Sequence, residues 1–342
     1  MEGERMELEE LAAAAAQLAA RGELEAARRK WREARRRARA QRDVAKRVEI
    51  GLRWAEAEAR WGDPATAERL AREQADLARR EGLERLFVRA ELLLGRQARD
   101  RSELEKALTH FALALDQAER GEEPHPEEWL DIGLAFLSVG MAAPAEASYR
   151  AALAHTLTGR QTAKALMGLA AALARLERAG EAVETARRAL DVAQATGQQD
   201  LVPELRTNVM IYLADAGRAA EARPILADLE RRGDLPEWWV RQAGAEAARI
   251  LWECGEPSAA GEWAERALAA GASGYQAALA HYVLWRFKRH LGDEEGAQAE
   301  IEAVMHLAAG ARDRPEDGHA MVRLLVRLLT ALDQPLPLGE GA

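Results

Sequence analysis

A repeat of 37 to 40 residues runs through the sequence, and it constrains the fold more than any other feature. When successive segments are aligned, one column holds an alanine in all eight copies. These alanines are Ala27, Ala67, Ala107, Ala145, Ala182, Ala222, Ala260 and Ala297. Repeats of this length are typical of solenoids, in which each unit buries its apolar face only against its neighbours.

Two further columns support the same register. A small residue stands twelve positions before the alanine in six copies: Ala15, Ala55, Gly95, Gly133, Ala170 and Ala248. A large residue follows four positions after it in several copies: Trp31, Phe111, Tyr149, Leu226 and Ile301. Small residues let two helix axes approach closely, and a large residue one turn further fills the space toward the next unit. Each copy is therefore predicted to form an antiparallel helix hairpin.

Composition agrees with an all-α chain. Ala, Leu, Glu and Arg dominate, whereas the β-branched residues that favour strands are scarce. Glycines recur where the hairpins are expected to turn, and a helix end accommodates a glycine with positive φ. These are Gly22, Gly62, Gly140, Gly217, Gly255 and Gly292. We expect about eight hairpins over residues 1–310.

The end of the chain has a different character. Residues 311–333 contain a polar stretch and then a strongly apolar helical pattern. This segment is predicted to be a capping helix that covers the last hairpin, as solenoids require. The alternative is a helix for dimerisation or for a partner. Residues 334–342, with Pro335 and Pro337, are predicted to be a flexible tail.

The repeat resembles the tetratricopeptide repeat (TPR). The third and fourth copies carry the resemblance, through Leu94, Gly95, Ala107, Phe111, Ala114, Trp129, Ile132, Gly133, Phe136, Ala145, Tyr149 and Ala152. It covers about residues 8–310 and implies a right-handed α-solenoid, a TPR-like superhelix. The copies are longer than the family's usual length of about 34 residues. They are similar to a bacterial variant found in sensor modules of transcriptional activators and in peptide-sensing regulators.

The resemblance also implies a ligand groove on the concave face, lined by the first helix of each hairpin. The family's groove positions correspond here to Arg89, Arg96, Arg99, Lys164, Arg175, Asn208, Arg249, Trp252, Tyr282, Arg286 and Arg289. Arginine pairs bidentately with carboxylates, so this set predicts an acidic or carboxylate-bearing ligand segment. The alternative is that these are solvated charges on helix faces.

Aromatic residues concentrate between residues 238 and 285. The adjacent Trp238 and Trp239 cannot both face one core, because neighbours on a helix lie about 100° apart. This cluster is interpreted either as core packing or as an aromatic binding site.

The segment from Arg28 to Arg47 holds eleven basic and two acidic residues, in a chain whose net charge is −9. Helical spacing predicts a basic patch on one stripe, made of Arg28, Arg32, Arg35, Arg39 and Arg42. Such a stripe could bind nucleic-acid phosphates or an acidic partner. The alternative is a solvated face balanced by the acidic N-terminus.

Other classes of function lack support in the sequence. No phosphate-binding loop, nucleophile elbow or histidine spacing for a metal is evident, so we expect no enzyme, no metal and no cofactor. No apolar run is long enough to span a membrane, and the first residues do not resemble a signal peptide. With a single cysteine, Cys254, no disulfide framework is possible, and we expect a cytoplasmic location. Scarce Asn and Cys fit either a heat-adapted source or a GC-rich genome.

The predicted function is non-catalytic binding of a protein or peptide by a scaffold or adaptor. A free-standing regulatory sensor for a ligand or peptide is the alternative. Nucleic-acid association through Arg28–Arg47 is the third hypothesis, although the net charge of −9 argues against general nucleic-acid binding.

Overall fold

The chain is all-α over the part that the computed structural model describes, which is residues 2–121, 125–231, 235–310 and 315–332. These residues form 17 helices and no strand, as predicted. In chain order the helices are α1 (Glu2–Ala20), α2 (Leu24–Ala40), α3 (Val44–Trp61), α4 (Pro64–Arg80), α5 (Glu84–Asp100), α6 (Leu104–Arg120), α7 (Pro126–Ser138), α8 (Ala142–Leu153), α9 (Gly159–Arg175), α10 (Ala179–Ala195), α11 (Val202–Asp215), α12 (Ala219–Arg231), α13 (Glu237–Glu253), α14 (Pro257–Ala269), α15 (Gly274–His290), α16 (Glu294–Gly310) and α17 (Pro315–Leu332).

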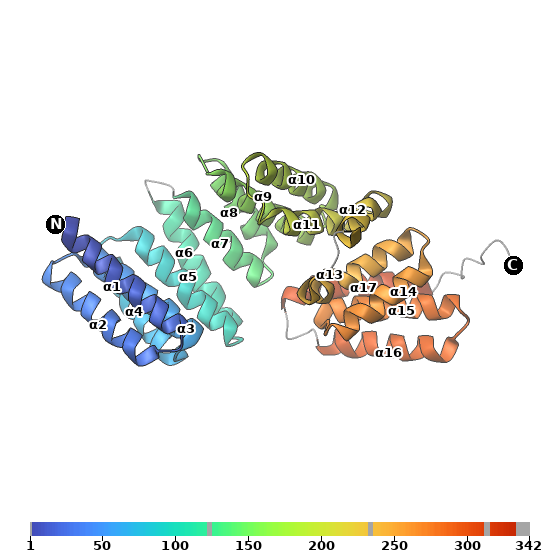
Figure 1. Cartoon of the computed structure of the whole chain (residues 1–342), viewed down its shortest axis with the longest axis horizontal. Coiled ribbons are helices and arrows are strands. Elements are labelled where there is room, and N and C mark those ends of the chain that lie inside the picture. The colour runs from blue at the N-terminus through green and yellow to red at the C-terminus, as the bar shows by residue number, and fades with distance from the viewer. Residues whose placement is uncertain (1, 122–124, 232–234, 311–314, 333–342) are drawn as a thin grey trace. The chain divides into compact units, whose positions relative to one another are not determined.

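Consecutive helices pair into eight hairpins, from α1–α2 to α15–α16, and α17 follows them (Figure 1). The hairpins belong to two compact units, Met1–Thr156 and Leu157–Ala342. Within the first unit, the first helices of successive hairpins contact one another, α1 with α3, α3 with α5 and α5 with α7. In the second unit α11 contacts α13, and α13 contacts α15. The first helices of a unit therefore form a layer of neighbouring helices.

The alanine column lies where paired helices touch. All eight alanines are at most 2% exposed. The small-to-large pairing is also confirmed, because a Cβ atom built on Gly95 would overlap the ring of Phe111. A Cβ on Gly133 would come within 2.9 Å of Tyr149 Cζ. Glycine in these copies thus makes room for an aromatic ring from the second helix.

Most of the predicted glycine turns have positive φ, for example 81° at Gly22 and 80° at Gly140. Gly62 differs, with φ of −123°. There the Glu58 carboxylate folds over the helix end and accepts a hydrogen bond from the N–H of Asp63 at 3.1 Å. A side chain on residue 62 would collide with that carboxylate, so glycine is needed for space rather than for its backbone angle.

The apolar face of α17 is only partly covered. Met321, Leu324 and Leu328 are at most 3% exposed and join the core of the second unit, where α17 packs against α15. The predicted C-terminal helix is thereby confirmed. Residues 334–342, predicted to be a flexible tail, lie outside the described residues. Among the helices that the structure describes, none is both long and apolar enough to cross a bilayer.

Candidate ligand-binding surfaces

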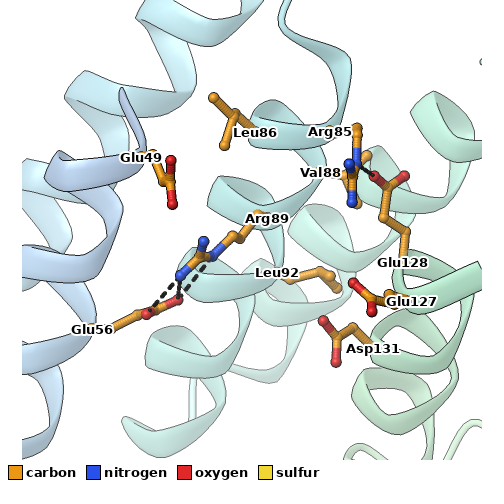
Figure 2. Close-up of a pocket in the computed structure, with 10 residues that line it drawn as sticks. All are labelled: Glu49, Glu56, Arg85, Leu86, Val88, Arg89, Leu92, Glu127, Glu128 and Asp131. Atoms are coloured by element: carbon orange, nitrogen blue, oxygen red, sulfur yellow. Dashed lines mark hydrogen bonds and ion pairs between the residues drawn. The ribbon is translucent and has the colours of Figure 1, made fainter. Parts of the chain in front are cut away.

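The layer of first helices in the first unit contains a cavity of about 610 Å³, here called the acidic cavity. Three neighbouring helices, α3, α5 and α7, supply its walls (Figure 2). Many of the lining residues are three, four or seven positions apart along a helix, such as Glu49 and Glu56, Arg85 and Arg89, and Glu127 and Asp131, which places them on one face. They are Glu49, Glu56, Arg85, Leu86, Val88, Arg89, Leu92, Glu127, Glu128 and Asp131.

Carboxylates outnumber guanidinium groups in this cavity by five to two, and both arginines already have acidic partners. Arg89 donates to both carboxylate oxygens of Glu56, at 3.0 and 2.9 Å. Arg85 Nε donates to Glu128 at 3.1 Å. Figure 2 shows the Asp131 carboxylate directed into the same space from α7. Glu49 also pairs with Lys46 at 2.9 Å and with Arg53 at 2.6 Å, two cations of α3 that do not line the cavity. Among the lining residues themselves, carboxylates exceed guanidinium groups.

Enclosure by the cavity walls raises the pKa of two of these carboxylates. Burial raises the pKa of Glu128 above its ordinary value, and Arg85 offsets part of this effect. Burial likewise raises the pKa of Asp131, against the opposing influence of Arg96 and Arg89. The Asp131 side chain is nevertheless accessible to solvent, since it points into the open cavity. A cation that entered would stabilise the charged form of both groups.

The predicted groove residues of α5 lie on or beside this face. Arg89 lines the acidic cavity, whereas Arg96 and Arg99 follow it toward the end of the helix. Arg96 is half-buried, and Arg99 pairs with Asp100 at 2.6 Å. Sequence reasoning placed Glu127 in the groove but missed Glu49 and Glu56 of α3 and Glu128 and Asp131 of α7, although Glu127 and Asp131 stand one helical turn apart.

Predicted groove residues of the second unit are more dispersed. Lys164 of α9 is exposed, while Arg175 of α9 and Asn208 of α11 are half-buried. Arg249 does not reach solvent, because it is 2% exposed. Its guanidinium donates to Glu246 at 2.8 Å and to Asp215 at 3.0 Å.

Burial alone would lower the pKa of Arg249, but Glu246 and Asp215 outweigh it, and the pKa lies above its ordinary value. This arginine is an internal structural charge, which contradicts its placement in an open groove. Loss of one partner from such a buried pair is strongly destabilising.

Three other predicted residues meet around a cavity of about 640 Å³. The Arg286 guanidinium lies over the ring of Trp252 at 4.8 Å and over that of Tyr282 at 5.9 Å. Tyr282 and Arg286 line this cavity together with residues of α11, α13 and α17. The fourth residue, Arg289, stacks on the buried Trp285 at 5.1 Å. The aromatic cluster therefore serves both interpretations, because Trp285 packs in the core and Tyr282 lines the cavity.

The two adjacent tryptophans have separate environments, as predicted. Trp239 is 5% exposed and its indole N–H donates to Thr207 Oγ1 at 2.9 Å. Trp238 is 51% exposed.

The helix α17 borders these first-helix faces of the second unit, which the sequence did not predict. Arg323 donates to the Ala174 carbonyl oxygen near the end of α9, at 3.1 Å. Arg327 lies 3.9 Å from Asp215 at the end of α11. The helix α17 lines a cavity of about 360 Å³ with α9, and its residues Val326 and Arg327 also line the cavity that contains Arg286. Any ligand in either cavity would therefore touch α17.

The predicted basic patch divides into paired and unpaired arginines. Arg28 donates to Glu58 and Glu25, each at 2.7 Å, and Arg35 pairs with Glu73. Arg32, Arg39 and Arg42 are exposed. The five residues thus do not form one free stripe, because two of them connect α2 to α3 and α4. Trp31, between them, is buried at 1% exposure.

No protein-family model matches the sequence, and no curated protein matches it. Solved structures do share its fold. A tetratricopeptide repeat protein from Parabacteroides merdae matches with a TM-score of 0.52 and 15% identity, over 81% of this chain and 97% of that one. NprR in complex with its cognate peptide NprX matches with a TM-score of 0.57 and 12% identity, over 84% and 85%. Aspartyl phosphate phosphatase F from Bacillus subtilis matches with a TM-score of 0.55 and 13% identity, over 98% and 97%. With its eight hairpins and their buried alanines, the chain has a tetratricopeptide-repeat-like fold.

Proposed function

We propose that the chain is a non-catalytic scaffold that binds a protein or peptide segment on its first-helix faces. In the first unit, we assign the acidic cavity to a lysine or arginine side chain of that segment. The observation that carries this assignment is Asp131, whose carboxylate is directed into the cavity and makes no ion pair with the described residues, while both lining arginines are already paired. A solved structure of similar fold, NprR, holds a peptide, which supports a peptide as the class of ligand. The proposal keeps the predicted cytoplasmic setting.

The proposed ligand of the first unit is positively charged, whereas the sequence predicted an acidic one. The predicted acidic segment depended on arginines of the first helices, but Arg89 is neutralised by Glu56. An acidic side chain in the cavity would face Glu127, Glu128 and Asp131, and both arginines that line the cavity are already paired. Apolar walls from Leu86, Val88 and Leu92 would instead pack against the aliphatic stem of a lysine or arginine.

The second unit supports a second candidate, a carboxylate at Arg286. Its guanidinium stacks on two rings, and within the described residues no carboxylate lies within ion-pair distance of it. Stacking leaves the in-plane N–H groups available for bidentate pairing. Asp215 and Glu253 also line this cavity of about 640 Å³, so a carboxylate-bearing segment, as the sequence predicted, would place its charge at Arg286.

The experiment measures binding of fluorescein-labelled 12-residue peptides by anisotropy. Three sets are compared at equal length and apolar content, carrying two arginines, two glutamates or two glutamines. We expect the arginine set to bind most tightly, and Asp131→Asn with Glu128→Gln to weaken it by about tenfold, as for the loss of one charge-assisted hydrogen bond. The matched control is Glu119→Gln on the outer face of α6, which should leave the affinity unchanged.

The outcomes separate the candidates. Tighter binding of the glutamate set, abolished by Arg286→Gln and unaffected by Asp131→Asn, would replace the first candidate by the second. Equal binding of all three sets would refute both. The regulatory sensor is the alternative function, and it predicts that the bound peptide reduces the radius of gyration in small-angle scattering.

A further inference from the structure

The helix α2 presents an unpaired arginine stripe to solvent. Arg29, Arg32, Arg36 and Arg39 are exposed and follow one another at intervals of three, four and three residues, which is one face of a helix. Within the described part of the chain, none of the four makes an ion pair. The acidic residues of α2 are engaged elsewhere, Glu25 with Arg28 and Glu33 with Arg37.

This stripe is distinct from the arginines that hold the hairpins together. Arg28, Arg35 and Arg37 point to other sides of α2, where they reach Glu58, Glu73 and Glu7. Those pairs would be lost if the helix rotated, so they fix which face remains outward. Some sides of α2 are thus held by ion pairs to other helices, and the side that carries the arginine stripe makes none with the described residues.

We propose that the arginine stripe binds the phosphate backbone of double-stranded nucleic acid. Four guanidinium groups spread over about 15 Å of helix provide a row of phosphate donors. Like charges at these spacings repel one another, and a polyanion would relieve that repulsion. The partner is identified by its phosphates alone, and duplex DNA and duplex RNA share them.

The surroundings of the stripe favour a nucleic-acid duplex over a protein or a single strand. Protein interfaces rely on buried aromatic and apolar anchors, whereas α2 presents no large exposed hydrophobic residue. Single strands are held by stacking of bases on aromatic side chains. The one aromatic residue of α2, Trp31, is buried and cannot stack. Binding to the phosphate backbone of a duplex requires only positive charge, which the exposed arginines of α2 supply.

The test uses the full chain and fluorescein-labelled 20-bp duplexes of mixed sequence, DNA in one arm and RNA in the other. Binding is followed by anisotropy from 20 to 200 mM salt. Four phosphate contacts predict a slope of log K against log salt of about −3 to −4. The variant R29Q/R32Q/R36Q/R39Q should lose at least tenfold in affinity at 50 mM salt and flatten the slope.

A matched control changes the net charge equally. R120Q/R150Q/R187Q/R231Q removes three exposed arginines and the half-buried Arg187, all of which have acidic partners on helices other than α2. We expect it to retain duplex binding, and circular dichroism to show both variants equally helical. Absence of duplex binding at 20 mM salt, or an equal loss in the control, would overturn the proposal. Binding of a polyglutamate peptide without binding of either duplex would also overturn it.

Discussion

Contacts between a glycine and an aromatic ring set the distance between helices in the first unit. Gly95 of α5 lies under the ring of Phe111 from α6, where a methyl group has no space. Gly180 of α10 offers a matched comparison, because a Cβ atom there would meet nothing within 4 Å.

Gly95→Ala should therefore lower the free energy of unfolding by about 1–3 kcal/mol through overpacking. Gly180→Ala should raise it by about 0.4–1 kcal/mol, since only the entropy of the unfolded chain changes. Urea denaturation followed by circular dichroism measures both. Equal effects of the two substitutions would mean that close packing at Gly95 is not a stabilising constraint.

The Glu58 carboxylate links three segments and makes stability depend on pH. The hydrogen bonds from Arg28 lower its pKa below the ordinary 4.5, and the N–H groups of Trp54 and Asp63 add to this. A lowered folded-state pKa contributes stability above the unfolded-state value, and that contribution is lost as pH falls through the folded-state pKa.

Glu58→Gln should then cost about 1–3 kcal/mol at pH 7, and the difference from wild type should shrink below pH 4.5. Chemical denaturation at a series of pH values checks this. Glu119→Gln, at an exposed site without an ion pair to the described residues, should give a small difference that does not change with pH.

Individual residues were predictable where packing repeats and unpredictable where charges pair. The alanine column depends on a contact that every hairpin makes, so its period appears in the sequence. The partners of Arg28, Arg89 and Arg249 lie 30 to 34 residues away, on neighbouring hairpins. The acidic residue that pairs with each arginine depends on how two helices are rotated about their axes. The composition of the sequence carries no information about that rotation.

At the scale of elements, α17 joins the second unit through half of its apolar residues. Leu328 is 2% exposed, whereas the adjacent Leu329 is 62% exposed. Leu328→Ala should remove about 2–5 kcal/mol of packing and release α17 from the unit. Leu329→Ala should have little effect, because its side chain is already solvated. Hydrogen exchange of the α17 amides measures the difference, and equal protection in both variants would contradict the observed docking face.

The amphipathic pattern of this helix predicted that it would bury one face, but not which surface would receive it. A cap requires contact with the last hairpin, which α15 provides. Contacts of Arg323 and Arg327 with the ends of α9 and α11 depend instead on how the chain folds back. A repeat pattern describes neighbours only, so an element that leaves the repeat is placed by contacts that the pattern does not encode.

At the scale of the whole molecule, two units with separate cores should unfold separately. One core cluster contains residues from Leu8 to Leu94, and the other contains residues from Ala170 to Leu328. In repeat proteins, stability spreads only through neighbouring contacts. Gly95→Ala should therefore speed hydrogen exchange in α1–α8 and leave α9–α16 protected as in wild type. Uniform acceleration across both units would show that the chain unfolds as a single cooperative structure.

The contact between Arg323 and Ala174 joins residues 149 positions apart, whereas the hydrogen bond from Arg53 to Glu9 between neighbouring hairpins spans 44 positions. On the ribosome, α9–α16 emerge before α17 and can fold hairpin by hairpin as they appear. The first-helix faces of the second unit are then uncovered for as long as translation takes to reach α17. A ligand that binds these faces would contact them without α17 on the nascent chain, and together with α17 once that helix has folded.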